Sequence, residues 1–257
     1  MWRPFILRAC LMLLLVPGTQ VPAQSPALPL FAYGKNEVSL SIQATRVMDY
    51  FQNDRHVYSG VIGRPAFTWN QKGELYAIWG LSRYSIQYAN PDQPDFRNRF
   101  HWIYGAGLTW YLPLARRWHL YVNAQVTFMK PAEKRKQAFD TRNTILIRIQ
   151  QTTYQRFQLH SGGYVAYFFN RLKCFLGLAW QYRTLSRRVT VFLDQEGEVQ
   201  QLNRTVSLYV RDRVLIPSLG FNLGLPDRHQ FGLHVQGTGP DNLAISIGLS
   251  QTGLIDD

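Results

Sequence analysis

The chain has 257 residues, of which 17% are charged and 46% are hydrophobic, and its mean hydropathy is −0.20. The apolar residues are therefore dispersed, and no stretch after the N-terminal segment reaches the roughly 18 uninterrupted apolar residues of a transmembrane helix, which excludes a helical membrane protein. Lys and Arg outnumber Asp and Glu by 28 to 16, a basic excess that is typical of proteins that bind nucleic acid or anionic surfaces.

The first 23 residues have the composition of a secretory signal peptide. Arg3 and Arg8 flank its start, the apolar core ACLMLLLV follows, and Val21 and Ala23 occupy the −3 and −1 positions of a cleavage site. The core is too short to span a bilayer, so removal by a signal peptidase is favoured over the alternative of a membrane anchor.

Export changes the interpretation of charge and of cysteine. Without residues 1–23, which contain two arginines and no acids, 26 basic and 16 acidic residues remain, a net charge of +10. An exported protein has little access to nucleic acid, so we expect a lipid bilayer and lipopolysaccharide headgroups as partners, and no nucleic acid. Cys10 is removed with the signal, which leaves Cys174 alone and no internal disulfide.

From residue 37 onward, polar and apolar residues alternate with a period of two, which predicts β-strands with one polar and one apolar face. In WHLYVNAQVTF (118–128), for example, Val122 belongs to the apolar face and Asn123 to the polar face. We predict ten strands, near residues 37–50, 56–69, 74–89, 99–112, 118–130, 152–169, 174–188, 205–225, 230–237 and 242–250.

The predicted connections are of two kinds, and these kinds alternate along the chain. NQKG, PLARR, NRLK and PDRH are short, whereas YFQNDRH, NPDQPDFRNR, the KPAEKRKQAFDTRN region and DQEGEVQQLNR are longer or more charged. In an antiparallel meander successive connections lie at opposite ends, so we expect one end with short turns and one with long loops. The segment 74–89 alternates poorly, and we expect a β-bulge near Gly80.

Ten antiparallel strands can hide an apolar face between stacked sheets, inside a soluble barrel, or against lipid outside a membrane barrel. The polar face here is mostly Ser, Thr, Gly, Gln, Asn, His and Tyr, which suit a hydrogen-bonded lumen, and the segments supply the roughly 9–11 residues of a tilted membrane strand. Aromatic residues flank the short turns, as in the girdle at the lipid headgroups, although aromatics are also common in strands. The residues assigned to this girdle are Trp69, Tyr76, Trp110, Tyr111, Trp118, Phe168, Phe169, Phe175, Phe221 and Phe231.

These features together resemble the small bacterial outer-membrane β-barrel proteins of the OmpA and OmpX type, with eight to ten strands. The resemblance rests on the leader MWRPFILRACLMLLLVPGTQVPA, the two-residue period, the aromatic-flanked turns and the alternating connection lengths. Members of that group usually finish on a strand with a terminal aromatic residue that the assembly machinery recognises. This sequence departs from that pattern, because no aromatic residue follows Phe231. The resemblance implies an all-β, antiparallel up-and-down transmembrane barrel of about ten strands, within a range of eight to twelve, in the outer membrane of a Gram-negative bacterium. The expected organisation is a signal peptide over 1–23, a periplasmic tail over 24–36 and the barrel over 37–257.

Signatures of catalysis are sparse. No Gly-rich phosphate loop precedes a helix and the six His are scattered, so we expect no cofactor and no metal. His160 and Ser161 are reminiscent of the His and Ser of outer-membrane lipid A deacylases, but a base and a nucleophile on one strand need a spacing such as i and i+2. We therefore assign no catalytic residue and expect a non-enzymatic barrel with a structural, surface-interaction or narrow-conduit role, in which long loops could contact an envelope protein. A lipid-modifying barrel enzyme and a soluble secreted barrel for an apolar ligand are the alternatives.

Polar and basic side chains on the inward face form the remaining candidate site. Four of them are expected in the half of the barrel nearer the long loops, where their positive charge could hold an anion or bias a small pore toward anions. These four are His101, Arg156, His160 and Arg183. The favoured alternative is a hydrogen-bonded plug, because interiors of this size are usually filled by side chains. The full set of lumen candidates is Arg64, His101, Tyr121, Asn123, Gln125, Arg156, Gln158, His160 and Arg183.

Overall fold

The computed structural model describes residues 37–51, 54–70, 72–90, 95–141, 144–195, 198–239 and 242–252. The predicted signal peptide and periplasmic tail lie outside the described residues. Within the described ranges the chain forms eleven strands: β1 (Glu37–Phe51), β2 (Asp54–Trp69), β3 (Gly73–Gln87), β4 (Phe96–Ala115), β5 (Trp118–Met129), β6 (Ala132–Thr141), β7 (Thr144–Phe169), β8 (Leu172–Gln195), β9 (Glu198–Gly224), β10 (His229–Gly239) and β11 (Asn242–Thr252).

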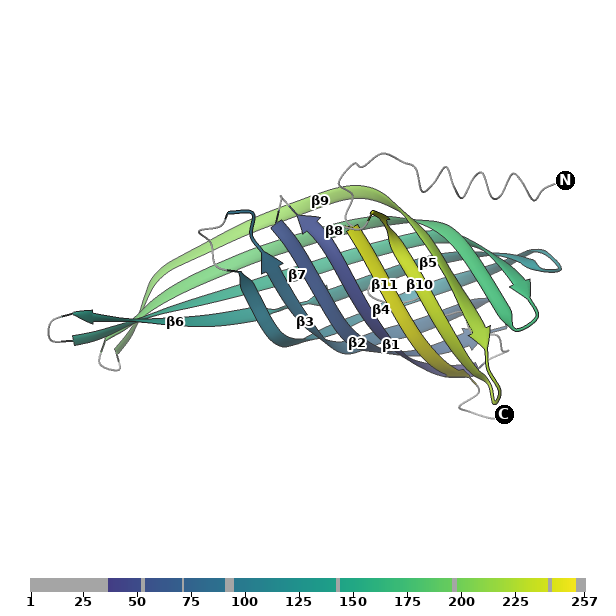
Figure 1. Cartoon of the computed structure of the whole chain (residues 1–257), viewed down its shortest axis with the longest axis horizontal. Helices are drawn as coiled ribbons and strands as arrows, with labels where there is room; N and C mark the ends of the chain where they lie inside the picture. The colour runs from purple at the N-terminus through teal and green to yellow at the C-terminus, as the bar shows by residue number, and fades with distance from the viewer. Residues whose placement is uncertain are drawn as a thin grey trace.

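Ten of these strands form a closed antiparallel ring (Figure 1). Neighbours in sequence pair from β1 to β5 and from β7 to β11, β5 pairs with β7, and β11 returns to β1. The closing pair runs from Ser39↔Thr252 to Met48↔Leu243. The expected all-β, up-and-down barrel of about ten strands is thereby confirmed, and β6, which pairs with β7, stands outside the ring.

Four tight connections lie at one end of the ring, and the described chain begins and ends there. They join β2 to β3, β4 to β5, β7 to β8 and β9 to β10, at the positions predicted for short turns. Asn70 and Asn170 adopt positive φ angles of 47° and 53° in two of these turns. Asparagine tolerates this left-handed conformation better than most residues, which explains why the chain reverses there without glycine.

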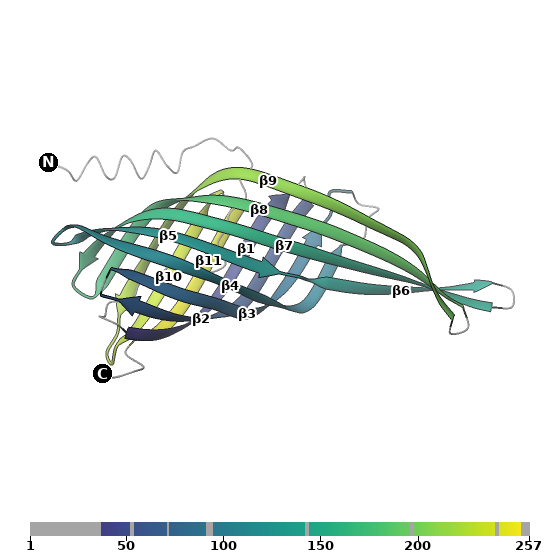
Figure 2. The ribbon, with the colours of Figure 1, turned by 180° about the vertical axis from the view of Figure 1, so that it is seen from behind.

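The opposite end departs from the expectation of long loops, except between β3 and β4, where β3 ends at Gln87 and β4 begins at Phe96. There β7, β8 and β9 continue as strands of 26, 24 and 27 residues, and the charged segment expected as a loop forms β6. β6 pairs with β7 as far as Thr141↔Thr144, and β8 pairs with β9 as far as Gln195↔Glu198. Figures 1 and 2 show this extension of β6, β7, β8 and β9, here called the arm (residues 132–141, 144–155, 184–195 and 198–211), projecting from the ring.

The two faces of the strands alternate even where the sequence does not show it. In β3, Ile78 points inward and Trp79 outward, so both faces are apolar and polarity does not reveal the alternation. The bulge expected near Gly80 begins two residues further on, where the β3–β4 register breaks between Ser82 and Tyr84, and the extra residue belongs to β4. Between these pairs one residue of β3 (83) faces two residues of β4 (99 and 100), which is the geometry of a β-bulge.

The ring is apolar outside and mixed inside. Its solvent-exposed large apolar side chains include Leu40, Ile42, Val61, Leu75, Trp79, Leu81, Trp102, Leu112, Val122, Leu178, Leu215, Leu219, Ile247 and Leu249. Its buried interior includes Gln43, Arg64, Glu74, Thr109, Asn123, Gln158, Lys173, Asn222, His234 and Gln236. This distribution is the reverse of that in a soluble protein, in which charged side chains are almost never fully buried.

Candidate functional site

All nine predicted lumen side chains are buried in the interior of the ring. They come from β2, β4, β5, β7 and β8, whose alternating residues point inward together. The nine are Arg64, His101, Tyr121, Asn123, Gln125, Arg156, Gln158, His160 and Arg183. The lumen therefore contains a concentration of polar groups, each of which needs a partner to offset its loss of water.

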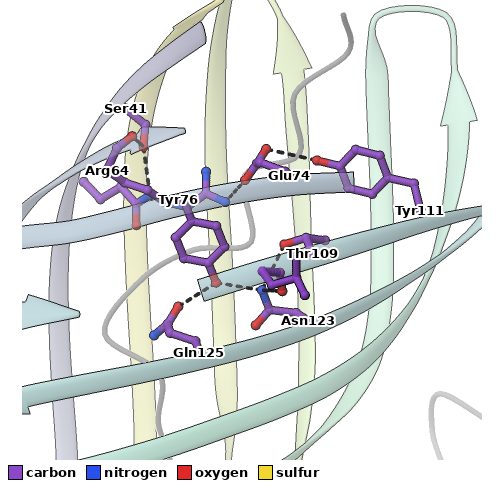
Figure 3. A network of polar contacts seen from close by, with 10 residues as sticks. Ser41, Arg64, Glu74, Tyr76, Thr109, Tyr111, Asn123 and Gln125 are labelled. Atoms are coloured by element: carbon purple, nitrogen blue, oxygen red, sulfur yellow. Dashed lines mark hydrogen bonds and ion pairs between the residues drawn. The ribbon is translucent and has the colours of Figure 1, made fainter. Parts of the chain in front are cut away.

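A buried ion pair joins β2 and β3 (Figure 3). Arg64 Nη2 donates to Glu74 Oε1, and the two side chains are only 1% and 0% exposed. The Tyr111 hydroxyl donates to the other carboxylate oxygen, Glu74 Oε2, at 3.0 Å. Sequence reasoning placed Arg64 in the lumen but left Glu74 at a turn. The β2–β3 register places Thr68 opposite Glu74, so the Arg64 side chain reaches Glu74 by lying across the Tyr76 ring, an arrangement that the sequence does not reveal.

Tyr76 links this ion pair to β4 and β5. The Arg64 guanidinium carbon lies 3.8 Å from the centroid of the Tyr76 ring. The Tyr76 hydroxyl donates to Gln125 Oε1 at 3.1 Å and accepts from Asn123 Nδ2 at 2.7 Å. Asn123 Nδ2 also donates to Thr109 Oγ1 at 3.0 Å. This lumen network joins side chains of β2, β3, β4 and β5 inside the ring (Figure 3).

Three of the four remaining basic candidates each contact a different lumen partner. His101 Nε2 lies 2.8 Å from Ser82 Oγ, and Arg156 Nη2 donates to Gln158 Oε1 at 3.4 Å. His160 Nε2 lies 3.1 Å from the Tyr164 hydroxyl. These contacts tie basic side chains to neutral hydrogen-bonding groups of the wall, as expected of a filled interior.

Three aromatic rings meet inside the barrel where the ring passes into the arm. The centroid separations are 4.7 Å for Phe96–Tyr154, 5.9 Å for Tyr84–Phe96 and 6.1 Å for Tyr84–Tyr154, all with edge-to-face geometry. We call these three rings the aromatic cap. The sequence does not reveal this cluster, because the aromatic pattern considered was that of the short turns and the segment that carries Tyr84 alternates poorly.

The predicted aromatic girdle requires correction at four positions. Tyr76, Tyr111 and Phe175 are buried inside the ring, and Phe168 packs against the inner cluster that contains Tyr111 and Phe175. The physical reason is the alternation itself, because each of these residues is adjacent in sequence to an outward-facing one. Proximity to a turn was therefore a weaker signal than position in the alternation.

The other six girdle candidates lie on the outward face beside the short turns. Two pairs of them are in ring contact, Trp69–Trp110 at 5.7 Å and Phe221–Phe231 at 6.1 Å. Trp118 contacts Tyr167, an outward aromatic that sequence reasoning missed, at 4.8 Å. The sixth, Phe169, is exposed. Amphipathic and aromatic side chains at one level of an outer wall are typical of a membrane–water interface.

A cavity of about 350 Å³ lies beyond the aromatic cap, on the face of the arm that continues the lumen wall. Phe96 and Tyr88 contribute to one side, and β6, β7 and β8 contribute Arg135, Arg148 and Arg187. Glu133 also lines the cavity. The sequence does not reveal this site, because the charge of the KPAEKRKQAFDTRN region (130–143) predicts a loop there and not a strand that brings Arg135 beside β7 and β8.

Tyr88 is held in the wall of this cavity by two contacts. Its hydroxyl is hydrogen-bonded to the hydroxyl of Tyr154, and the Arg187 guanidinium carbon lies 5.5 Å from its ring centroid. Burial is the largest influence on the Tyr88 hydroxyl and raises its pKa, so the group is protonated at neutral pH. Tyr88 thus connects the cavity to the aromatic cap.

Comparison with known proteins gives structural likeness only. No protein-family model matches the chain, and no curated protein matches it. Among solved structures, the outer membrane protease OmpT from Escherichia coli is 8% identical, with 89% of this chain and 100% of that chain covered and a TM-score of 0.46. An outer membrane channel from Pseudomonas putida F1 is 8% identical, with 89% of this chain and 100% of that chain covered and a TM-score of 0.45. LpxR from Salmonella typhimurium is 10% identical, with 83% of this chain and 99% of that chain covered and a TM-score of 0.37. At these values no property of those proteins transfers to this chain.

The His and Ser that the sequence places side by side in β7 lie on opposite faces of the strand. His160 points into the lumen, whereas its neighbour Ser161 is half-buried on the opposite face, so the two do not form a dyad. No group of three or more His, Cys, Asp or Glu in the described ranges is arranged to hold a metal ion. The described residues also contain no helix that is long and apolar enough to cross a membrane.

Proposed function

We propose that this chain is an integral outer-membrane β-barrel protein without enzymatic activity, with a filled lumen and a surface-interaction role for the arm. The observation that supports this most directly is the inverted polarity of the ring. Leu219 and Leu249 are exposed on the outer wall, while Arg64, Glu74 and Lys173 are almost fully buried inside. A bilayer around the wall stabilises this arrangement, because closed barrels satisfy every backbone hydrogen bond within hydrocarbon.

The same observation argues against a soluble secreted barrel that binds an apolar ligand. Such a barrel would turn its large apolar side chains inward and its charged ones outward. In water, a continuous apolar belt around the ring would far exceed the few hundred Å² that monomeric soluble proteins expose as one patch.

The filled lumen favours anchorage and surface interaction over conduction. The lumen network around Tyr76 and the aromatic cap lie at two successive levels of the interior. Beyond the cap, the arm extends strands that are more than twice the roughly 9–11 residues needed to cross the membrane. A stable sheet held outside the bilayer is suited to contact other molecules. The net charge of +10 expected after export supports anionic lipopolysaccharide as a neighbour.

The orientation of the wall can be tested with a matched pair of labels. Single spin labels at Val122 and Asn123, adjacent residues of β5, are introduced into a variant in which Cys174 is replaced by Ser, and the protein is reconstituted in lipid vesicles. We expect a lipid-dissolved relaxation agent to reach the label at 122 and not the one at 123. The reverse pattern would contradict a membrane barrel.

Two further measurements separate the filled barrel from its alternatives. In planar bilayers we expect no steady conductance from the unmodified protein, and stable anion-selective steps would show an open conduit. In a lipid-analogue hydrolysis assay we expect no turnover. Activity that is lost on His160→Ala or on Ser161→Ala would show that the chain is an enzyme.

A further inference from the structure

The cavity at the base of the arm has an unbalanced positive charge. Three arginines, Arg135, Arg148 and Arg187, and one carboxylate, Glu133, line it. Glu133 is already engaged, because Arg135 Nε and Nη2 donate to its two oxygens at 2.9 and 3.1 Å. Among the residues that the structure describes, no carboxylate lies within 4 Å of Arg148 or Arg187. Two guanidinium charges therefore lack a counter-charge from the described chain.

Contacts hold two of these arginines, Arg135 and Arg187, against neighbouring strands. Arg135 Nη2 also donates to the Asp95 backbone oxygen, which fixes β6 against the start of β4. Arg187 lies against the Tyr88 ring, and its Nε is buried without a hydrogen-bond partner in the described structure. A buried donor without a partner is costly unless a ligand or water satisfies it. Such a pre-arranged donor is what a bound oxyanion requires.

We propose that this cavity binds a small, soluble molecule that carries a phosphate group, such as a sugar phosphate. Arginine forks match the oxygens of phosphate in bidentate geometry. The amides of Gln137 and Gln150, which also line the cavity, can donate to and accept from neighbouring hydroxyl groups. A volume of about 350 Å³ is at the lower end of the range of small-molecule pockets, which suits a single phosphorylated sugar.

The location favours a ligand that arrives from water. The lining residues of β6, β7 and β8 lie on the face of the arm that continues the lumen wall, and not on the outer wall. Phe96, in the aromatic cap, closes the side toward the lumen. The cavity therefore lies on the arm side of the aromatic cap, outside the ring. The cavity itself does not depend on what surrounds the ring, but the choice of a soluble ligand rests on the proposed function, in which the arm lies outside the bilayer.

The test is a titration of the purified, full-length folded protein in zwitterionic detergent with glucose 6-phosphate, inorganic phosphate and glucose, by calorimetry. We expect saturable binding of glucose 6-phosphate that weakens as salt is raised, weaker binding of phosphate, and none of glucose. The double variant Arg148→Gln/Arg187→Gln should lose at least about tenfold in affinity. The control Arg83→Gln removes the same charge from an exposed outward position of β3 and should bind like the parent protein.

Repeating the titration in bilayers with and without an anionic phospholipid identifies the source of the phosphate. If the anionic bilayer competes with glucose 6-phosphate, a lipid phosphate also enters the site; if it does not, the ligand is soluble, as proposed. No saturable binding in detergent, or equal losses in the double variant and in Arg83→Gln, would overturn the assignment. Because the detergent titration uses no bilayer, its failure is distinguishable from failure of the labelling test on the wall.

Discussion

Removing the charge of Glu74 should destabilise the barrel strongly. In Glu74→Gln the side chain keeps its volume and can still accept a hydrogen bond from Tyr111, so the variant isolates the loss of the negative charge beside Arg64. Breaking a buried ion pair from one side costs about 3–5 kcal/mol. Arg64 is 1% exposed and retains its contact with the Tyr76 ring, so we expect a loss at the lower end, about 3 kcal/mol.

The assay is urea unfolding in detergent micelles, followed by tryptophan fluorescence. With an m-value of about 2 kcal/mol per molar urea, a loss of about 3 kcal/mol lowers the unfolding midpoint by about 1.5 M. The double variant Arg64→Met/Glu74→Gln leaves no buried charge at this position, and we expect it to recover most of the loss. Asp95→Asn is the matched control, because Asp95 pairs with an exposed arginine, Arg97, at 3.4 Å. Exposed pairs contribute about 0–1 kcal/mol.

Two results would refute this reasoning. If Glu74→Gln unfolds at the same urea concentration as Asp95→Asn, the ion pair does not contribute to the free energy of unfolding as its burial implies. If the double variant is no more stable than Glu74→Gln, the loss does not arise from the uncompensated arginine.

Two other substitution pairs test the lumen network and the outer wall. A Cβ at Gly107 would lie 2.2 Å from the Tyr76 ring, so Gly107→Ala should lower the free energy of unfolding by about 1–3 kcal/mol, whereas Gly163→Ala, with nothing within 4 Å, should not; equal effects would contradict the packing. Leu219 and Val199 are similarly exposed on β9, at 58% and 59%, but only Leu219 lies within the ring. In bilayers Leu219→Arg should cost about 2–4 kcal/mol and Val199→Arg little, and equal costs in refolding measurements would argue against a membrane around the ring.

The alternation of side chains was the part of the fold that the sequence made predictable. In β5 each residue can be assigned to a face, and Val122 and Asn123 lie as predicted. The positions of the strands and of the short turns could be predicted from this alternation, because it is interrupted at the turns. Two of these turns contain Asn70 and Asn170. No local pattern in the sequence shows that β1 pairs with β11. A closed sheet is predicted only because ten strands with one apolar face must hide that face.

Contacts between strands and the structure of the arm were not predictable in the same way. The partner of Arg64 depends on the register of β2 against β3, which no local pattern fixes. The segment that forms β6 is highly charged, and charge was taken to indicate a loop. In a sheet that projects into water, however, Lys and Arg side chains remain solvated on both faces, so charge does not prevent strand pairing. The cavity depends on β6 and was therefore also missed.

The seam between β1 and β11 makes the barrel dependent on residues that are translated far apart. Thr45 Oγ1 and Ser246 Oγ, which lie 2.9 Å apart across this seam, are separated by 201 positions in the chain. Until the seam closes, both strands would present a full row of backbone groups to hydrocarbon, which costs several kcal/mol for each group left without a partner. A truncation before Asn242 should therefore yield no partly inserted barrel, and insertion should be an all-or-none event.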